Sequence, residues 1–156
     1  MQQLPHDYAR LINESIKDRP SEMAVTVHMC RGNAKSRWFA EGGYEPVAEA
    51  IFNEMNVDGF FLEYDDERSG DFAPLRFVPK GRTVVLGLVT TKRGELEERD
   101  AIKRRIDEAT EYVPLEQLCL SPQCGFASVA EGNVITEDDE KKKLSLIVEL
   151  ADEIWG

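Results

Sequence analysis

The residues best suited to chemistry in this 156-residue sequence stand where strand-like apolar runs end. His28 and Cys30 lie two positions apart at the end of the run 23–30. Alternate residues of a strand point to the same face, so both side chains can reach one ion. Glu63 closes the apolar run 59–64, where a carboxylate must be exposed, paired or bound to a metal.

A further candidate, Cys124, follows the run 117–120 in the turn SPQCG. Parallel α/β folds and barrels place their active sites at the carboxyl ends of strands, which is where all these residues stand. Two thiolates, an imidazole and a carboxylate form a set that zinc can bind. H-x-C is not a zinc-finger spacing, so spacing alone also allows unrelated core or surface residues. Cys119, between two leucines, is expected to be a small buried hydrophobic residue.

The elements that must position these residues alternate between strands and helices. Apolar periodicity predicts strands over 23–30, 59–64, 83–90 and 117–120, and helices over 7–17, 45–55 and 96–113. A capping box at Thr136 and Asp139 predicts a last helix that buries Leu144, Ile147, Val148, Ala151 and Ile154. Such βα units predict a parallel sheet of the α/β class. The continuous apolarity of 83–90 predicts that both faces of this sheet are covered.

Composition excludes several classes of protein. The chain has 30 acidic and 19 basic residues and a net charge of −11, which argues against nucleic acid as a partner. No apolar run approaches the roughly 18 residues that a membrane span needs, and the first residues lack the features of a signal peptide. Three cysteines are too few for a disulfide scaffold. We therefore expect one domain over 1–156, with about four βα units, in a reducing compartment such as the cytoplasm.

Four segments resemble the cobalamin-independent methionine synthase family, and in particular its short bacterial members. They are VHMCRGN at 27–33, FLEYD at 61–65, LGLVTTKRGELE at 86–97 and LSPQCGFAS at 120–128. The resemblance covers the chain from residue 5 to its end. It implies a (βα)8 TIM barrel of the methionine synthase/uroporphyrinogen decarboxylase-like type, of which this chain is the C-terminal half. It also implies zinc on His28, Cys30, Glu63 and Cys124.

The activity that the resemblance implies is methyl transfer to a thiol, with homocysteine as acceptor. Methyltetrahydrofolate or a corrinoid methyl group is the implied donor. Zinc coordination turns a thiol into the nucleophilic thiolate, and we expect Glu63 to yield its place to the substrate sulfur.

Three further residues are weaker candidates. Lys92 stands where the family has a proton-handling histidine, so it is either an acid or a solvated loop lysine. Arg31 and Asn33 border the zinc strand and either contact a substrate carboxylate or bond to the backbone of their own loop. Asp65 and Arg68 are interpreted as a surface ion pair. The family's acidic residues that hold the amino acid substrate lie mostly upstream of this chain.

Two alternatives stay open at this point. One is a non-catalytic, zinc-binding half-barrel fragment, and the other is a cobamide-dependent thiol methyltransferase on a related barrel. A full barrel needs about 250 residues. Four βα units leave two edge strands where a barrel would close. We therefore expect self-association or pairing with the missing half.

Overall fold

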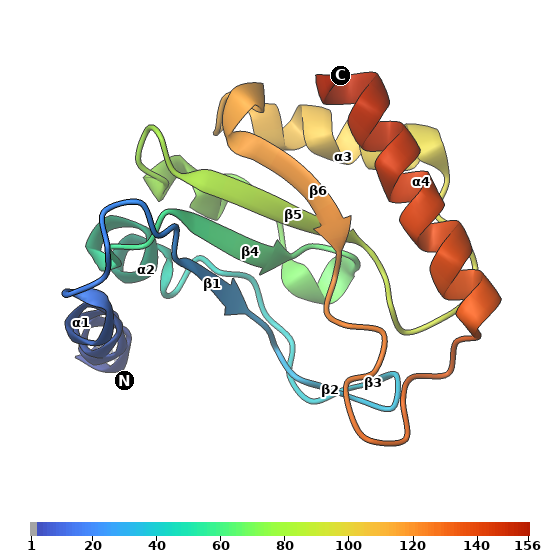
Figure 1. Ribbon diagram of the computed structural model, residues 1–156, viewed down its shortest axis with the longest axis horizontal. Coiled ribbons are helices and arrows are strands. Elements are labelled where there is room, and N and C mark those ends of the chain that lie inside the picture. Colours follow the sequence, from blue (N-terminus) through green and yellow to red (C-terminus); the bar gives the residue numbers. More distant parts are fainter. Residues whose placement is uncertain (1–2) are drawn as a thin grey trace.

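The computed structural model describes residues 3–156 and shows one parallel sheet flanked by helices (Figure 1). The sheet has the spatial order β1, β4, β5, β6, and every neighbouring pair is parallel. Its strands are β1 (Thr26–Met29), β4 (Gly59–Glu63), β5 (Thr83–Val89) and β6 (Leu118–Pro122). The helices are α1 (Gln3–Ile16), α2 (Ala48–Glu54), α3 (Arg99–Thr110) and α4 (Glu137–Trp155). The predicted α/β class and the alternation of strands with helices are confirmed.

The segment 31–43, predicted as a plain loop, contains a small antiparallel hairpin. Its strands are β2 (Asn33–Ala34) and β3 (Arg37–Trp38). The turn residues Lys35 and Ser36 have φ values of 48° and 66°, in the left-handed region. Two-residue turns of this kind favour Asn-Gly or Asp-Gly, so the Lys-Ser pair gave no turn signal in the sequence.

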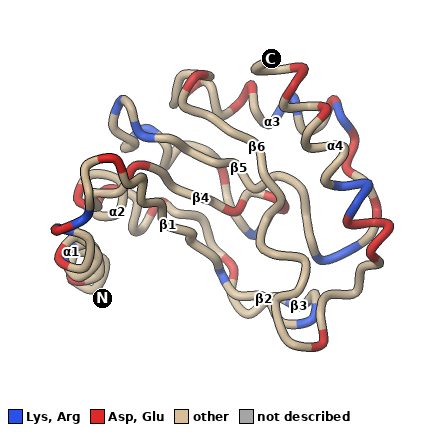
Figure 2. Tube along the Cα trace, viewed as in Figure 1, with Lys and Arg blue, Asp and Glu red and all other residues tan. Residues whose placement is uncertain are grey.

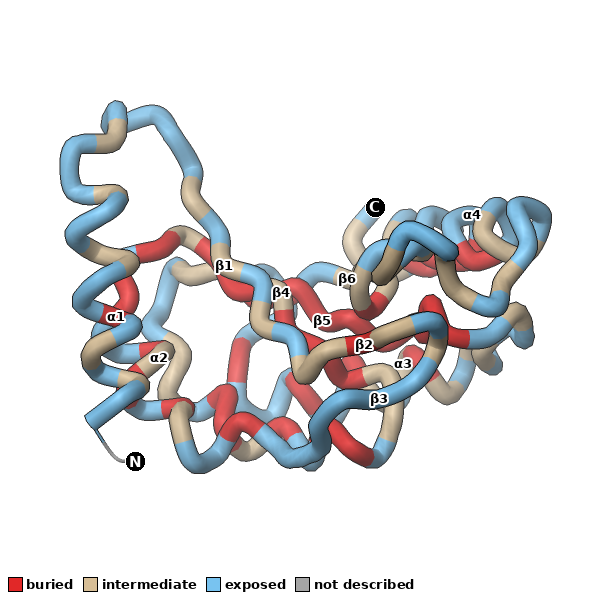
Figure 3. The backbone as a smooth tube through the Cα atoms, turned by 90° about the horizontal axis from the view of Figure 1, so that it is seen from below, coloured by how far each residue is buried: buried red, intermediate tan, exposed pale blue. Residues whose placement is uncertain are grey.

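One face of the sheet packs against helices and forms the core. Phe60, Val84 and Leu86 on this face are fully buried, and they belong to one cluster with residues of α2, α3 and α4. The rings of Phe52 in α2 and Phe60 in β4 meet edge to face, with centroids 5.0 Å apart. Figure 3 shows the buried stretches concentrated in β4 and β5.

The opposite face is open at the edge strands, so the prediction of a sheet covered on both faces is wrong there. The in-register residues His28, Phe61, Val85 and Cys119 share this face. Val85 in the central strand β5 is buried, whereas His28 in β1 and Cys119 in β6 are exposed. Cys119 is therefore not the buried residue that its leucine neighbours suggested. It belongs to an edge strand and points away from the helices.

The predicted capping box of α4 is confirmed, because Thr136 and Asp139 exchange both hydrogen bonds. The predicted apolar stripe of α4 is only partly correct, since Leu144 and Val148 are 41% and 58% exposed. Ile147 is buried as predicted, and the other buried apolar residues are Leu146 and Leu150. Charged residues line α3 and α4, as Figure 2 shows. No helix among residues 3–156 is long and apolar enough to span a membrane.

Asp58, just before β4, ties together the amino ends of three strands. Its carboxylate accepts a hydrogen bond from the backbone N–H of Val25 at 2.8 Å, and it pairs with Arg19 at 2.8 Å and Arg82 at 3.3 Å. The bond from Val25, helped by the two arginines, holds the pKa of Asp58 below its usual range.

We expect Asp58→Asn to destabilise the fold near pH 7 and to lose this effect in acid. A carboxylate with a lowered folded pKa contributes stability above its unfolded pKa of about 3.9, and that contribution disappears as the pH falls through the folded value. Urea unfolding at a series of pH values measures this, with the exposed Asp18→Asn as the matched control. A difference between Asp58→Asn and wild type that does not change with pH would contradict this account.

Candidate metal centre

The four predicted metal ligands meet at the carboxyl end of the sheet. His28 lies in β1, Cys30 directly after it, Glu63 ends β4, and Cys124 follows β6. One ligand atom from each side chain lies within 4.8 Å of every other. Figure 1 shows the same end of the sheet beside the β2–β3 hairpin and the loop that follows β6. Residues up to 96 positions apart in the sequence thus form one cluster.

The spacings within the cluster fit a tetrahedral ion. Sγ of Cys30 lies 3.4 Å from Sγ of Cys124, which lies 3.7 Å from Nε2 of His28. That Nε2 is 3.7 Å from Oε1 of Glu63, and Oε1 also contacts Sγ of Cys124. Zinc bond lengths imply ligand separations of about 3.3–3.8 Å around a tetrahedron. The donor types and most of these distances therefore suit a zinc ion.

Burial differs sharply across the cluster. The side chain of Glu63 has no exposed surface, whereas that of His28 is 44% exposed. Cys30 is exposed and Cys124 is half-buried. The cluster thus has a closed side at Glu63 and an accessible side at β1, which a substrate could approach.

The surroundings of Glu63 and Cys124 shift the pKa values of these two groups in opposite directions. Burial raises the pKa of Glu63, but hydrogen bonds from the Cys124 and Cys30 thiols outweigh burial and hold that pKa below its usual range. Burial, together with the neighbouring Glu63, raises the pKa of the Cys124 thiol. With protein groups alone, Cys124 therefore keeps its proton. A dication held by these four residues would favour the thiolate instead, because it stabilises a coordinated sulfur anion directly.

Gly87 in β5 lets Cys124 reach Glu63 across the sheet. Glu63 and Ser121 are its in-register neighbours on either side. A Cβ at Gly87 would lie 3.0 Å from the carbonyl oxygen of Leu62 and 3.1 Å from Cα of Gln123. A side chain here would push against the backbone of both neighbouring segments, so glycine permits the segment after β6 to pass close to β4.

Tyr44 holds the ends of β1 and β4 together behind the cluster. Its hydroxyl accepts a hydrogen bond from the backbone N–H of Glu63 at 2.8 Å and donates to the carbonyl of Met29 at 3.0 Å. Tyr44 is buried. The sequence offered no signal for this role, because Tyr44 stands in a loop far from both strands.

The weaker substrate-binding candidates are largely engaged or buried. Arg31 stacks on the ring of Tyr44 and donates to the carbonyls of Glu63 at 3.2 Å and Ser69 at 3.3 Å. Asn33 is 7% exposed, and its amide has no hydrogen-bond partner among the described residues. A contact of Arg31 or Asn33 with substrate stays a prediction.

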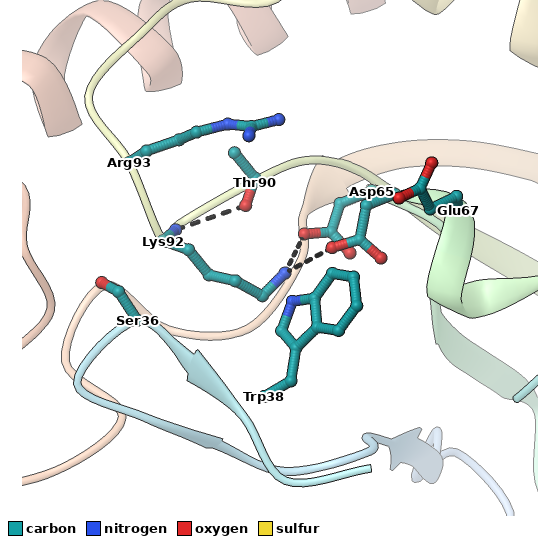
Figure 4. Close-up of a pocket in the computed structure, with 8 residues that line it drawn as sticks. Ser36, Trp38, Asp65, Glu67, Thr90, Lys92 and Arg93 are labelled. Atoms are coloured by element: carbon teal, nitrogen blue, oxygen red, sulfur yellow. Dashed lines mark hydrogen bonds and ion pairs between the residues drawn. The ribbon is translucent and has the colours of Figure 1, made fainter. Parts of the chain in front are cut away.

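Lys92 is not the solvated loop lysine of the alternative interpretation. It is 8% exposed, and its ammonium contacts Asp65 and lies 3.1 Å from Oδ2 of Asp66 (Figure 4). These residues line a cavity of about 530 Å³, and Trp38 of the hairpin lines it beside the Lys92 ammonium. The interpretation of Asp65 as a surface residue paired with Arg68 is wrong, since its side chain has no exposed surface and pairs with Lys92.

Arg68 is also buried, and it was missed as a site residue. Its Nη2 lies 3.4 Å from Oε2 of Glu63, and its Nε lies 3.5 Å from Oδ1 of Asp66. An arginine in a polar, charge-rich loop has the sequence signature of a surface residue. Its position under the cluster depends on how residues 65–81 fold back.

The fold and site define a parallel α/β protein with a candidate metal centre at its strand ends. Residues 8–152 match the family described as the cobalamin-independent synthase catalytic domain. The chain belongs to this family, as the sequence resemblance predicted.

Similar proteins are longer than this chain. The uncharacterized proteins YxjG and YxjH of Bacillus subtilis (strain 168) are 58% and 54% identical to it, over 95% and 97% of the chain. The matched region covers 39% of YxjG and 41% of YxjH. The chain therefore spans about two fifths of the length of these curated relatives.

Solved structures show the same fold. A Listeria monocytogenes protein described as a candidate vitamin-B12-independent methionine synthase is 47% identical, with a TM-score of 0.76 over 98% of this chain and 42% of its own. A B12-independent methionine synthase from Shewanella sp. W3-18-1, in complex with selenomethionine, is 16% identical, with a TM-score of 0.75 over 99% of this chain and 45% of its own. These neighbours are TIM-barrel proteins of the methionine synthase family, which confirms the predicted fold type.

We expect Tyr44→Phe to lower the free energy of unfolding by about 1–3 kcal/mol. The change removes only the hydroxyl and leaves the buried N–H of Glu63 without its acceptor. Tyr8→Phe, on a side chain that is 55% exposed, is the matched control and should change little. Urea unfolding of both variants measures the difference. Equal stability of Tyr44→Phe and wild type would show that this bond does not hold the strand ends.

Proposed function

We propose that this chain supplies the zinc-binding part of an enzyme that transfers a methyl group to a thiol. The acceptor is a homocysteine-like thiol, and the donor is methyltetrahydrofolate or a corrinoid methyl group. The observation that supports this most is the convergence of His28, Cys30, Glu63 and Cys124 within 4.8 Å at the carboxyl end of a parallel sheet. Family membership supports the reaction type.

Zinc, when bound, would supply the positive charge that keeps a substrate thiol as its thiolate at neutral pH. The four ligand residues of this chain would have different roles. His28, Cys30 and Cys124 would stay as the permanent ligands. Glu63 would be the ligand that the thiol replaces, because a carboxylate oxygen is a harder donor than the two sulfurs.

Lys92 is the residue we propose for proton handling near the methyl donor. Its ammonium holds a proton between Asp65 and Asp66 at the wall of the 530 Å³ cavity. Arg68 pairs with both Asp66 and Glu63, so the cavity and the metal centre share one network of ion pairs. A methyl donor bound in this cavity would therefore lie next to the metal centre, where the substrate thiol would bind.

The open face of the sheet supports a partial-barrel arrangement. The edge strands β1 and β6 and the exposed His28 and Cys119 face the side where further strands of a barrel would stand. We propose that residues 1–156 form one partial barrel domain, completed by the rest of a barrel or by a second copy. The unpaired thiols suit a reducing compartment such as the cytoplasm.

We expect the wild-type chain, purified without chelators, to hold about one zinc ion and Cys124→Ser to lose most of it. The substitution removes one of two thiolates from the four-ligand set. Cys119→Ser is the matched control, because Cys119 lies outside the cluster and should keep wild-type zinc content. Metal analysis with chelator competition measures both. Equal zinc content in the two variants would contradict the proposed site.

Methyl transfer is then assayed with homocysteine and each donor separately. Methionine formed by wild type and Cys119→Ser, but not by Cys124→Ser, supports the transferase, and the productive donor identifies the methyl source. The chain is assayed joined to the remaining part of the barrel from a longer relative, because it spans only about two fifths of those proteins. Zinc uptake without methionine from either donor in that complete barrel contradicts the transferase and favours the non-catalytic zinc-binding fragment.

A further inference from the structure

The two carboxylate oxygens of Glu63 have separate sets of partners. Oε1 faces the metal cluster, where it contacts Sγ of Cys124 and lies 3.7 Å from Nε2 of His28. Oε2 faces the opposite way, toward positive charge and an amide. It lies 3.4 Å from Nη2 of Arg68 and 3.4 Å from the backbone nitrogen of Arg31. The carboxylate therefore presents one oxygen to the cluster and the other to the protein.

Arg68 is fixed on several sides and cannot readily follow Glu63. Its Nη1 donates to the carbonyls of Gly32 at 3.3 Å and Ala40 at 3.4 Å, and its guanidinium lies over the ring of Trp38. Its side chain has no exposed surface. A planar guanidinium held in this way offers its donors in a rigid fork.

Arg31 is the weaker partner of the same oxygen. Its Nη1 is 3.9 Å from Oε2 of Glu63, and its guanidinium donates instead to Tyr44 and to backbone carbonyls. Arg68 therefore provides the nearest side-chain cation to Oε2.

A carboxylate with both oxygens free can chelate a metal, whereas one whose second oxygen is held binds through a single oxygen. A carboxylate bound through one oxygen is easier for a substrate thiol to displace than one that chelates through two.

We propose that Arg68 is a positioning residue that holds Oε2 of Glu63, so that Glu63 offers only Oε1 to the metal and can be exchanged for the substrate thiol. This inference rests on the proposed function and assigns its ligand exchange to a residue outside the ligand set. Partners that bind the second atom of a ligand orient it and tune the metal. When the thiol displaces Oε1, Arg68 keeps the released carboxylate paired and close to its original place.

The test uses cobalt(II), whose visible absorption is intense in four-coordinate sites and clearly weaker in five-coordinate ones. Wild type should give the intense four-coordinate spectrum. Arg68→Gln frees Oε2, so its bound cobalt should show the weaker five-coordinate spectrum, and its zinc affinity in chelator competition should fall by about 10- to 100-fold. Arg76→Gln is the control, because Arg76 forms an exposed pair with Glu45 and should match wild type in both measurements.

A role limited to folding would give a different result. Arg68 also holds the carbonyls of Gly32 and Ala40, so Arg68→Gln could lower the melting temperature through those contacts alone. In that case the spectrum for each bound cobalt stays four-coordinate, which overturns the inference. Arg68→Lys keeps the positive charge but loses the planar set of N–H donors of the guanidinium. It provides a second test if Arg68→Gln does not fold. It should give the five-coordinate spectrum, and a four-coordinate one overturns the inference.

The outcome also separates this inference from the proposed function. A wild-type chain that binds no cobalt through cysteine sulfur overturns both. Cobalt bound through sulfur, with identical spectra in wild type and both Arg68 variants, overturns only the role of Arg68.

Discussion

The site depends on one buried charge, the carboxylate of Glu63 at the end of β4. This group has no exposed surface, and a buried carboxylate is strongly unfavourable unless partners surround it. Arg68 and Arg31 meet it from one side, and the thiols and imidazole of the cluster meet it from the other. Because both sides are needed, removing either the arginines or the thiols that donate to this carboxylate would leave the charge poorly compensated.

The parallel sheet explains how distant residues reach this carboxylate. Strands that run in the same direction end at the same edge, so the segments after β1, β4 and β6 meet there. Gly87 keeps the surface of β5 clear between Glu63 and the segment that bears Cys124. The hairpin joins the loop after β6, since the N–H of Val134 donates to Oγ of Ser36 at 2.9 Å. The same edge therefore holds both the candidate metal centre and the cavity beside Lys92.

Local patterns in the sequence were enough to predict the strand ends and the ligand cluster. His28 and Cys30 share a face because strands alternate, and Glu63 stood out as a charge in an apolar run. Arg68 was mistaken for a surface residue, because nothing local reveals a loop that folds under a cluster. Cys119 and Leu144 look like core residues in sequence, but their exposure depends on which face of the sheet or helix the rest of the protein covers. The hairpin was missed because Lys35 and Ser36 adopt left-handed backbone without the residues that usually announce it.

The most direct measurement is X-ray absorption of the zinc-loaded protein, before and after homocysteine is added. The account predicts a four-coordinate ion with two sulfur neighbours, from Cys30 and Cys124, together with one nitrogen and one oxygen neighbour. Adding the thiol should raise the sulfur count to three as the oxygen of Glu63 leaves. A zinc ion surrounded only by nitrogen and oxygen would contradict the cluster as its site. An unchanged sulfur count after addition of homocysteine would contradict the exchange at Glu63.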